Sequence, residues 1–228
     1  MFRVMECIAY QHKHDLVILA ALVCIFGSLA LFILLKRSTD CVERRRRRWL
    51  IVASIVAGFG VWATHFIAML AYDGGMPLSF GPGLTALSVV FVIVGFGASL
   101  QILGRTVTLQ SAVAAGVLTT TGIALMHFTG MAAIIAPATI NYDWSPIVSA
   151  YVIVALLNAA AYFGFSRFDG PAKILIPAAL ACAGVVLLHF TGMSATVLVA
   201  DPTKAMPDLR DMDAAWLVGA IAVVSFFM

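Results

Sequence analysis

One five-residue pattern, His-Phe-x-x-Met, occurs three times along this chain at a fixed interval. The copies begin at His65, His127 and His189, so each begins 62 residues after the one before it. Every copy lies inside a long apolar stretch, where an ionisable side chain is costly and usually has a function. The interval predicts a fold built from repeated units, and the three histidines are candidate functional residues.

The composition is that of a membrane protein. Of the 228 residues, 62% are hydrophobic and 11% are charged, whereas soluble domains carry about 25% charged residues. The mean hydropathy is +1.03. A helix needs roughly 20 apolar residues to cross a bilayer, and seven spans are predicted: 16–35, 50–72, 84–104, 112–136, 146–165, 173–199 and 214–228. The last span is short and stops within its apolar pattern, so we expect that the chain is cut there.

The repeat interval contains two spans, which predicts the architecture. Two crossings return the chain to the side where it started, so successive helix pairs are parallel repeats with equivalent residues at equivalent depths. We therefore expect one all-α membrane domain over residues 1–228, with seven transmembrane helices built from three parallel helix-pair repeats plus a terminal helix. The repeats are expected at about 16–72, 84–136 and 146–199.

A glycine stands five residues before each motif histidine: Gly60, Gly122 and Gly184. Small residues let membrane helices approach closely. We therefore expect the second helices of the three pairs to pack near one another, with the first helices outside them.

Basic residues predict the orientation, because ten lie in one set of loops and four in the other. The ten are Lys36, Arg37, Arg44 to Arg48, Arg105, Arg167 and Lys173, and the four are Arg3, Lys13, Lys204 and Arg210. The positive-inside rule places the N-terminus outside and the C-terminus in the cytoplasm. The five-arginine run is typical of an anchor to the headgroups of the lipid bilayer, and it is too short to predict nucleic-acid binding.

Within each copy, the histidine and the methionine are four residues apart and share one helix face. The candidate metal ligands are His65, Met69, His127, Met131, His189 and Met193. The loops that follow begin at Asp73, Pro137 and Asp201, which are eight, ten and twelve residues after the histidines. At the helical rise this places all three histidines about 12–18 Å below the outer loops.

Copper is the metal that this set of ligands fits best. Imidazole binds zinc, copper, iron and nickel, and thioether favours copper. Haem is the alternative cofactor, because histidine and methionine both serve as its axial ligands. The same residues also have ordinary roles: a membrane histidine often bonds a neighbouring helix, and a methionine often fills the core.

Two further histidines, His12 and His14, precede the first span in a short polar segment. They form a candidate accessory site for a metal that arrives from the outer side. The ordinary alternative is that both are solvated.

Two copies of the motif extend further, as Met126-His127-Phe128-Thr129 and Leu188-His189-Phe190-Thr191, each followed by Gly-Met. These segments resemble the bacterial MHYT domain, named for its Met-His-Tyr-Thr motif, and the resemblance covers essentially the whole chain. Among its departures from the motif, the chain has Phe66, Phe128 and Phe190 in place of tyrosine, Thr64 in place of methionine and Ala68 in place of glycine.

The resemblance implies a seven-span sensory module of the bacterial inner (cytoplasmic) membrane. Its histidines and methionines are expected to bind copper and through it to detect oxygen, carbon monoxide or nitric oxide. The resemblance also implies a cytoplasmic signalling output domain as partner, either an enzyme of cyclic-di-GMP synthesis or degradation or a histidine kinase.

The leading hypothesis is a sensor without catalysis of its own, in which a change at the metal shifts the helix packing between two states. A transporter of copper ions or protons is the first alternative, although transporters usually place their sites near the midplane. A redox enzyme ranks last, because no nucleophile–base pair, carboxylate dyad or phosphate loop is visible in the sequence. The sequence leaves open the stimulus, the number and oxidation state of the metals, and the oligomeric state, including a homodimer.

Overall fold

The computed structural model describes residues 2–204 and 215–227. Within these residues the chain forms eight helices and two small two-stranded sheets. Two helices are short: α1 (Phe2–Tyr10) and α8 (Ala215–Phe227). The other six are long and apolar enough to cross a membrane: α2 (His14–Thr39), α3 (Glu43–Ala71), α4 (Pro82–Ile102), α5 (Leu109–Ala132), α6 (Trp144–Arg167) and α7 (Ala172–Ser194). The protein is therefore an all-helical, multi-pass membrane protein.

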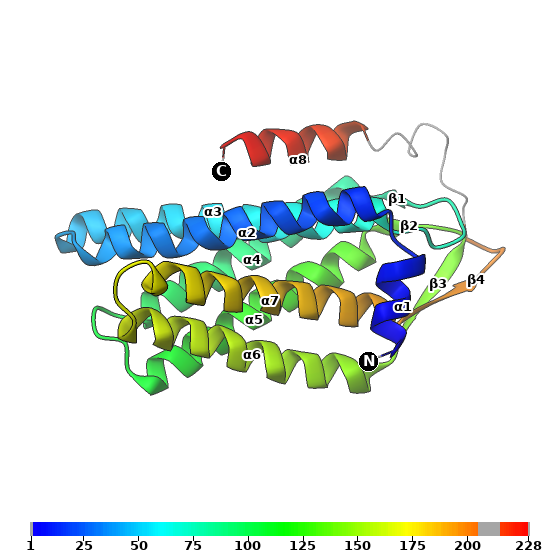
Figure 1. The fold of residues 1–228 in the computed structure, drawn as a ribbon. Helices are drawn as coiled ribbons and strands as arrows, with labels where there is room; N and C mark the ends of the chain where they lie inside the picture. Colours follow the sequence, from blue (N-terminus) through cyan, green and yellow to red (C-terminus); the bar gives the residue numbers. More distant parts are fainter. Residues whose placement is uncertain (1, 205–214, 228) are drawn as a thin grey trace.

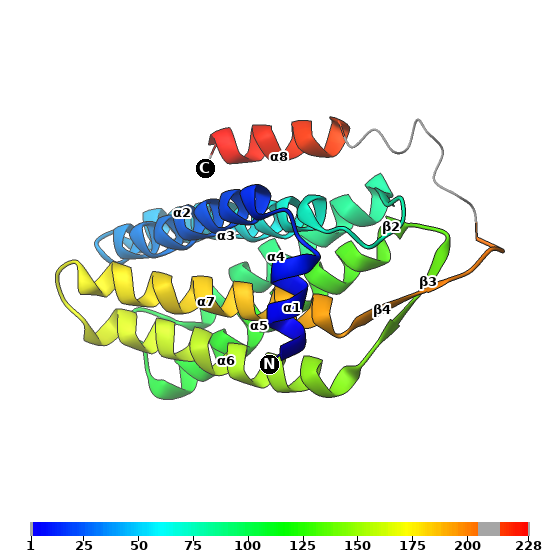
Figure 2. The same cartoon turned by 45° about the vertical axis from the view of Figure 1, so that its right-hand side comes forward.

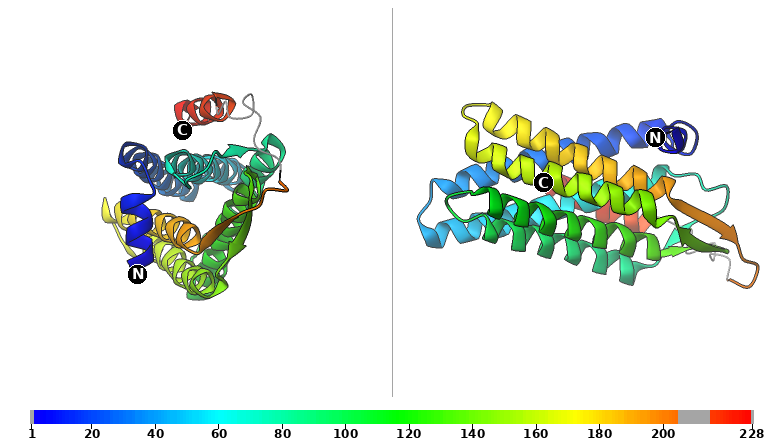
Figure 3. Two further views of the ribbon diagram at one scale, coloured as in Figure 1. Left: turned by 90° about the vertical axis from the view of Figure 1, so that its right-hand side faces the viewer. Right: turned by 90° about the horizontal axis from the view of Figure 1, so that it is seen from below.

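The six long helices form a closed ring in chain order (Figure 1, Figure 3). Each helix packs against the helix before it and the helix after it, and α7 closes the ring against α2. In addition, α5 contacts both α3 and α7, so the second helices of the pairs also approach one another. The most buried of the six is α3.

Consecutive long helices pair as three antiparallel hairpins, α2/α3, α4/α5 and α6/α7, and one backbone hydrogen bond closes each hairpin at the same end. The N–H of the residue that caps the first helix donates to a carbonyl at the end of the second helix. The three bonds join Lys13 to Ala71 (2.9 Å), Gly81 to Ala133 (2.8 Å) and Asp143 to Ala195 (2.9 Å). We call them the hairpin clamps, and the end of the bundle that holds them the clamped end.

Short extended segments accompany the clamps. The strands pair as β1 (Ser79–Phe80) with β2 (Ile134–Ile135) and as β3 (Ala138–Tyr142) with β4 (Thr196–Ala200), both antiparallel. In the first hairpin, a single bridge between His12 and Tyr72 stands in the corresponding place. Figure 2 shows β3 and β4 reaching beyond the helix ends. Each hairpin is thus closed by the segment before its first helix and the segment after its second.

Glycines bring neighbouring helices of the ring into close contact. A Cβ atom at Gly95 of α4 would meet the Cα atom of Gly122 of α5 at 2.7 Å, and a Cβ atom at Gly184 of α7 would meet the Val154 side chain of α6 at 3.3 Å. These glycines therefore serve the contacts within hairpins. The expectation that they bring the second helices together was wrong for Gly122 and Gly184.

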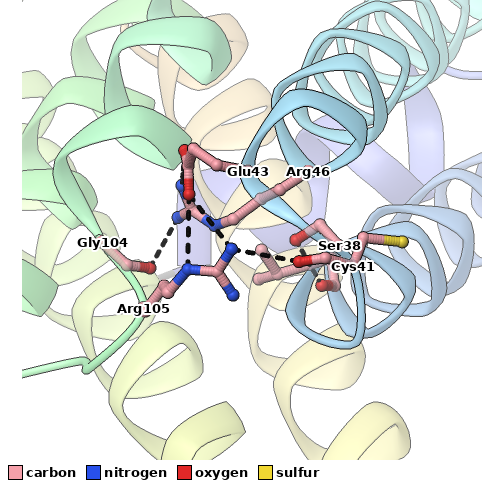
Figure 4. Close-up of polar contacts among 7 residues, drawn as sticks. Ser38, Cys41, Glu43, Arg46, Gly104 and Arg105 are labelled. Carbon is pink, nitrogen blue, oxygen red and sulfur yellow. Dashed lines mark hydrogen bonds and ion pairs between the residues drawn. The ribbon is translucent and has the colours of Figure 1, made fainter.

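The opposite end of the bundle, which we call the arginine end, holds the five-arginine run at the start of α3. Figure 4 shows Glu43 between two guanidinium groups, those of Arg46 (3.4 Å) and of Arg105 in the α4–α5 loop (3.1 Å). Arg46 also donates to the carbonyl of Gly104 (2.7 Å), and Arg105 donates to that of Cys41 (3.0 Å). These contacts tie two of the loops at this end together.

The six spans predicted between residues 16 and 199 coincide with α2 to α7, with ends that differ by up to seven residues. The seventh predicted span falls partly outside the described residues, and its described part, α8, has 13 residues and is not one of the six long helices. Arg210, assigned to an outer loop, also lies outside the described residues. The N-terminal segment was expected to be a loop, but it contains α1, which packs against α7.

Candidate metal centre

The three motif histidines meet near the clamped end, on three helices that run in the same direction. His65 lies six residues before the end of α3, and His127 and His189 lie five residues before the ends of α5 and α7. This register places the three imidazoles at one depth. The sequence predicted less equal distances from the histidines to the helix ends. The difference arises because α5 and α7 end at Ala132 and Ser194, before the loop starts predicted at Pro137 and Asp201. We call these residues the histidine triad.

The triad converges through its Nδ1 atoms. His65 Nδ1 lies 3.2 Å from the Nδ1 atoms of both His127 and His189. One ligand nitrogen from each residue lies within 4.8 Å of the others. The rings stand nearly perpendicular to one another, at interplanar angles of 75°, 77° and 89°. The residues are only 2%, 1% and 5% exposed in chain order, so the point of convergence is shielded from solvent.

The three histidines of the triad cannot satisfy all of their hydrogen-bonding groups with one another. A neutral imidazole has one N–H donor and one acceptor nitrogen, and the Nε2 atoms of all three rings are buried without a partner in the described structure. His65 Nδ1 faces two other Nδ1 atoms but has only one hydrogen or one lone pair to offer them. Buried polar groups are ordinarily paired. The convergence of the three Nδ1 atoms makes the triad a candidate ligand site.

The geometry of the triad fits a single metal ion. Imidazole nitrogens bind such ions at about 2.0–2.1 Å, so three nitrogens in a plane around an ion stand about 3.5 Å apart. The triad nitrogens already approach this spacing. Haem fits less well, because its iron leaves two axial positions for protein ligands and here three nitrogens converge. Calcium and magnesium need oxygen ligands, and among the described residues no carboxylate belongs to the cluster.

The motif methionines, Met69, Met131 and Met193, are buried in the apolar core of the bundle. Each lies about one helical turn closer to the clamped end than its histidine. Their participation as metal ligands stays a prediction.

Each motif phenylalanine packs against the residue that precedes the cap of the next hairpin around the ring. Phe66 contacts Phe80, Phe128 contacts Tyr142 and Phe190 contacts His12, with ring centroids 5.6, 5.4 and 5.3 Å apart. Because each of the three partners directly precedes a clamp residue, His12, Phe80 and Tyr142 occupy equivalent positions in the three hairpins. We call these six side chains the aromatic roof. The three phenylalanine rings also touch the adjacent triad rings edge-on.

His12 and His14 have different environments. His14 is exposed at the start of α2, whereas His12 is 6% exposed. His12 Nδ1 donates to the carbonyl of Cys7 (2.8 Å), and its Nε2 atom has no partner in the described structure. Burial lowers the pKa of His12, and the bond to Cys7 opposes this in part. Burial also raises the pKa of the Cys7 thiol to about 11. Of the two, only His12 belongs to the aromatic roof, and metal binding by His12 and His14 stays a prediction.

The motif glycines have a role that the sequence analysis missed. A Cβ atom at Gly130 would collide with the His65 ring, and a Cβ atom at Gly192 would collide with the His127 ring. The glycine of one copy thus leaves room for the imidazole of the copy before it. The signal was present, because a glycine follows both His127 and His189 by three residues.

A second buried polar group lies on α4, α5 and α6. Thr119 Oγ1 donates to Ser99 Oγ (2.9 Å) and lies 2.8 Å from Tyr162 Oη, and Ser99 also donates to the carbonyl of Phe96 (2.9 Å). All three hydroxyls have partners. We call Ser99, Thr119 and Tyr162 the hydroxyl cluster.

Comparison with known families finds the MHYT family, described as a bacterial signalling protein N-terminal repeat, at residues 58–116 and 121–178. Together these two segments cover half of the chain. The chain belongs to the MHYT family. The two matched MHYT segments contain His65 and His127, and His189 lies beyond them in the third copy of the motif.

This MHYT chain is similar to much longer signalling proteins. It is 32% identical over 213 residues to an uncharacterized signaling protein of Caulobacter vibrioides, covering 91% of this chain and 26% of the relative. It is 30% identical over 223 residues to the bifunctional diguanylate cyclase/cyclic di-GMP phosphodiesterase MucR of Pseudomonas aeruginosa (94% and 32%). It is 31% identical over 228 residues to the cyclic di-GMP phosphodiesterase NbdA of the same species (92% and 28%). The chain therefore spans a third or less of the length of each of these relatives. No solved structure matches it.

Proposed function

We propose that this MHYT chain is a sensory module of the bacterial inner membrane that binds copper through the histidine triad. Met69, Met131 and Met193 are the proposed additional ligands. The observation that carries the proposal is the convergence of three buried imidazoles whose hydrogen bonds do not close. Thioether groups one turn away favour copper over zinc. Bound copper would supply a centre whose ligands or redox state respond to oxygen, carbon monoxide, nitric oxide or the copper supply.

The residues around the triad would orient and shield that centre. With the proton on Nε2, each imidazole presents the lone pair of Nδ1 toward the point of convergence. Gly130 and Gly192 leave room for the Nε2 sides of the His65 and His127 rings, because they have no side chain there. The aromatic roof closes the clamped end above the triad and excludes water.

Contact between α3 and α8 supports a route for the signal. Leu217 and Ile221 of α8 are buried, and α8 packs against α3, which carries His65. His65 touches both other members of the triad, so a change in the nitrogen spacing would shift α3 against α8. We propose α8 as a seventh crossing that passes this shift to a cytoplasmic output domain, with the N-terminus outside. The names of two relatives favour an output domain that makes or degrades cyclic di-GMP.

The proposal is tested by measuring bound metal on protein purified in detergent and reconstituted with cuprous copper under reducing conditions. Metal content by mass spectrometry and an absorption spectrum are compared for wild type and for a His65/His127/His189→Ala variant. A Met69/Met131/Met193→Leu variant tests the thioethers with little change in core volume. Tyr162→Phe serves as the control, because it alters a buried polar group away from the triad.

We expect about one copper per chain in wild type and in the control, weaker binding in the methionine variant and none in the histidine variant. A Soret band in the absorption spectrum would show that the cofactor is haem and not copper. A wild-type protein that takes up no copper would overturn the proposal, and copper uptake into vesicles above background would favour the transport alternative.

A further inference from the structure

A cavity of about 230 Å³ opens between α5, α6 and α7 near the clamped end. Ala124 and Phe128 of α5, Ala150 of α6 and Gly192 of α7 line it. Trp144 at its edge is 60% exposed, so the cavity reaches the outer surface of the helix ring, which the lipid bilayer covers. We call it the side cavity.

The side cavity is apolar and lies beside the triad. The one hydroxyl group in its lining, that of Tyr151, is paired with Thr121 Oγ1 at 2.7 Å. Gly192 lines the cavity and also lies against the His127 ring, where a Cβ atom would collide with it. Phe128, another lining residue, packs edge-on to His127 with ring centroids 4.9 Å apart. Gly192 and Phe128 therefore contact both the side cavity and the His127 ring.

At the position of α3 that is equivalent to the side cavity, a large side chain fills the space. Trp62 stands 62 residues before Ala124, at the equivalent position of α3, and it is buried. Its indole N–H donates to the carbonyl of Thr85 (3.1 Å) and to Ser88 Oγ (3.2 Å). Sixty-two residues further on, the equivalents of Trp62 and Ser88 are Ala124 of α5 and Ala150 of α6, so both the indole and its hydroxyl partner are missing between the second and third hairpins. The side cavity lies at the position equivalent to the one that the Trp62 indole fills between the first and second hairpins.

We propose that the side cavity admits a small apolar molecule, a diatomic gas dissolved in the bilayer, and delivers it to the His127 side of the triad. This inference rests on the proposed function, since it supplies the ligand of the same centre. An apolar cavity stays dry and binds guests such as xenon, and the lining of the side cavity is apolar apart from the paired Tyr151 hydroxyl and the Trp144 indole N–H. An ion gains nothing from such a lining and loses its hydration, so the cavity selects uncharged molecules that arrive from the lipid.

The first test uses metal-free protein and xenon as the probe. Xenon sites are located by anomalous scattering in pressurised crystals of wild type and of an Ala124→Trp/Ala150→Ser variant, which copies Trp62 and Ser88. Ala124→Leu is a second, smaller filling variant in case the tryptophan variant does not fold. Leu125→Trp is the matched control, because its side chain is exposed on the neighbouring face of α5. We expect xenon in wild type and in the control and no xenon in the filled variants. An empty cavity in wild type, or a lipid chain seated in it, would overturn the proposal.

The second test uses copper-loaded, reduced protein and measures the association rate of carbon monoxide after flash photolysis. We expect filling to slow association by about tenfold or more, because a filled core leaves few voids of molecular size, while the copper content stays unchanged. An unchanged rate in a variant that excludes xenon would overturn this inference and leave the copper site standing. Absence of copper in wild type would instead remove the proposed function, and the xenon result would still decide whether the cavity takes apolar guests.

Discussion

The histidine triad and the hydroxyl cluster are both polar, both buried and both formed by three helices, yet they differ in how their hydrogen bonds are used. In the hydroxyl cluster, Thr119 links Ser99 to Tyr162 and every hydroxyl has a partner. In the triad, the Nε2 atoms have no partner and the Nδ1 atoms crowd one point.

This difference separates a structural polar group from a proposed binding site. A closed set of hydrogen bonds compensates for its own burial and needs nothing further. In the triad, three Nδ1 atoms face one another, which is costly unless a proton or a metal ion lies between them. The comparison therefore predicts that changes at the triad alter ligand binding, whereas changes at the hydroxyl cluster alter only stability.

The largest effect is expected from Gly192→Ala, because the new methyl group would collide with the His127 ring. We expect the unfolding free energy to fall by about 1–3 kcal/mol, as in other overpacked cores. Copper affinity should fall by about tenfold or more, because the ligand is displaced. Gly83→Ala is the control, since no atom lies within 4 Å of its added Cβ. Equal copper affinity in Gly192→Ala and wild type would contradict the assigned geometry.

A smaller effect is expected from Tyr162→Phe, which removes one hydroxyl of the hydroxyl cluster. Thr119 keeps its bond to Ser99, so the loss in unfolding free energy should be about 0.6–1 kcal/mol. Copper content should be unchanged. Denaturant unfolding and metal analysis of the same preparation check both points, and loss of copper would break the contrast between the two regions.

The pH dependence of stability is expected to include a contribution from His12 of the aromatic roof. Burial lowers its pKa, so the unfolded chain binds a proton more readily than the folded chain does. Stability is then retained above the ordinary histidine pKa of about 6.5 and lost as the pH falls below it. His12→Phe, which copies the equivalent Phe80, should make this loss smaller. Unfolding of metal-free protein at about pH 7.5 and about pH 5.5 measures it, and an unchanged loss would exclude His12 as a source.

The smallest effect is expected at the arginine end, from Glu43→Gln. The carboxylate of Glu43 pairs with Arg46 and Arg105, but its side chain is 69% exposed. Exposed ion pairs contribute about 0–1 kcal/mol, and salt screens them. We expect a change in unfolding free energy below about 0.5 kcal/mol that disappears at high salt. A loss as large as that of Gly192→Ala would show that polar contacts outside the membrane core matter as much as the triad.

The sequence was informative about the triad because helical registers are short-range. Three histidines at a fixed interval, one in every second apolar helix, can be arranged in few ways in a helix bundle. His65, His127 and His189 do converge. The aromatic roof could not be predicted in the same way. Phe80 and Tyr142 are 62 residues apart, which is the repeat interval, but His12 lies 68 residues before Phe80, so only the clamp at Lys13 makes His12 equivalent to them.

The side cavity could be predicted less well than the triad and better than the aromatic roof. The sequence shows that Trp62 and Ala124 differ at one repeat position, but the consequence depends on which way the side chain points. Only the contacts of the Trp62 indole with Thr85 and Ser88 show that a large side chain belongs in that space. Differences between internal repeats thus become interpretable once one copy has been seen folded.

The position of the hairpin clamps has a mechanical consequence. The long helices contain between 21 and 29 residues, and each hairpin is pinned at the end close to the triad. With the clamp as a fulcrum, the triad lies about 8 Å along a lever about 35 Å long. A ligand that spreads the imidazoles by about 0.7 Å would then swing the arginine end by about 3 Å, turning a change in bond length into a displacement large enough for a neighbouring domain to register.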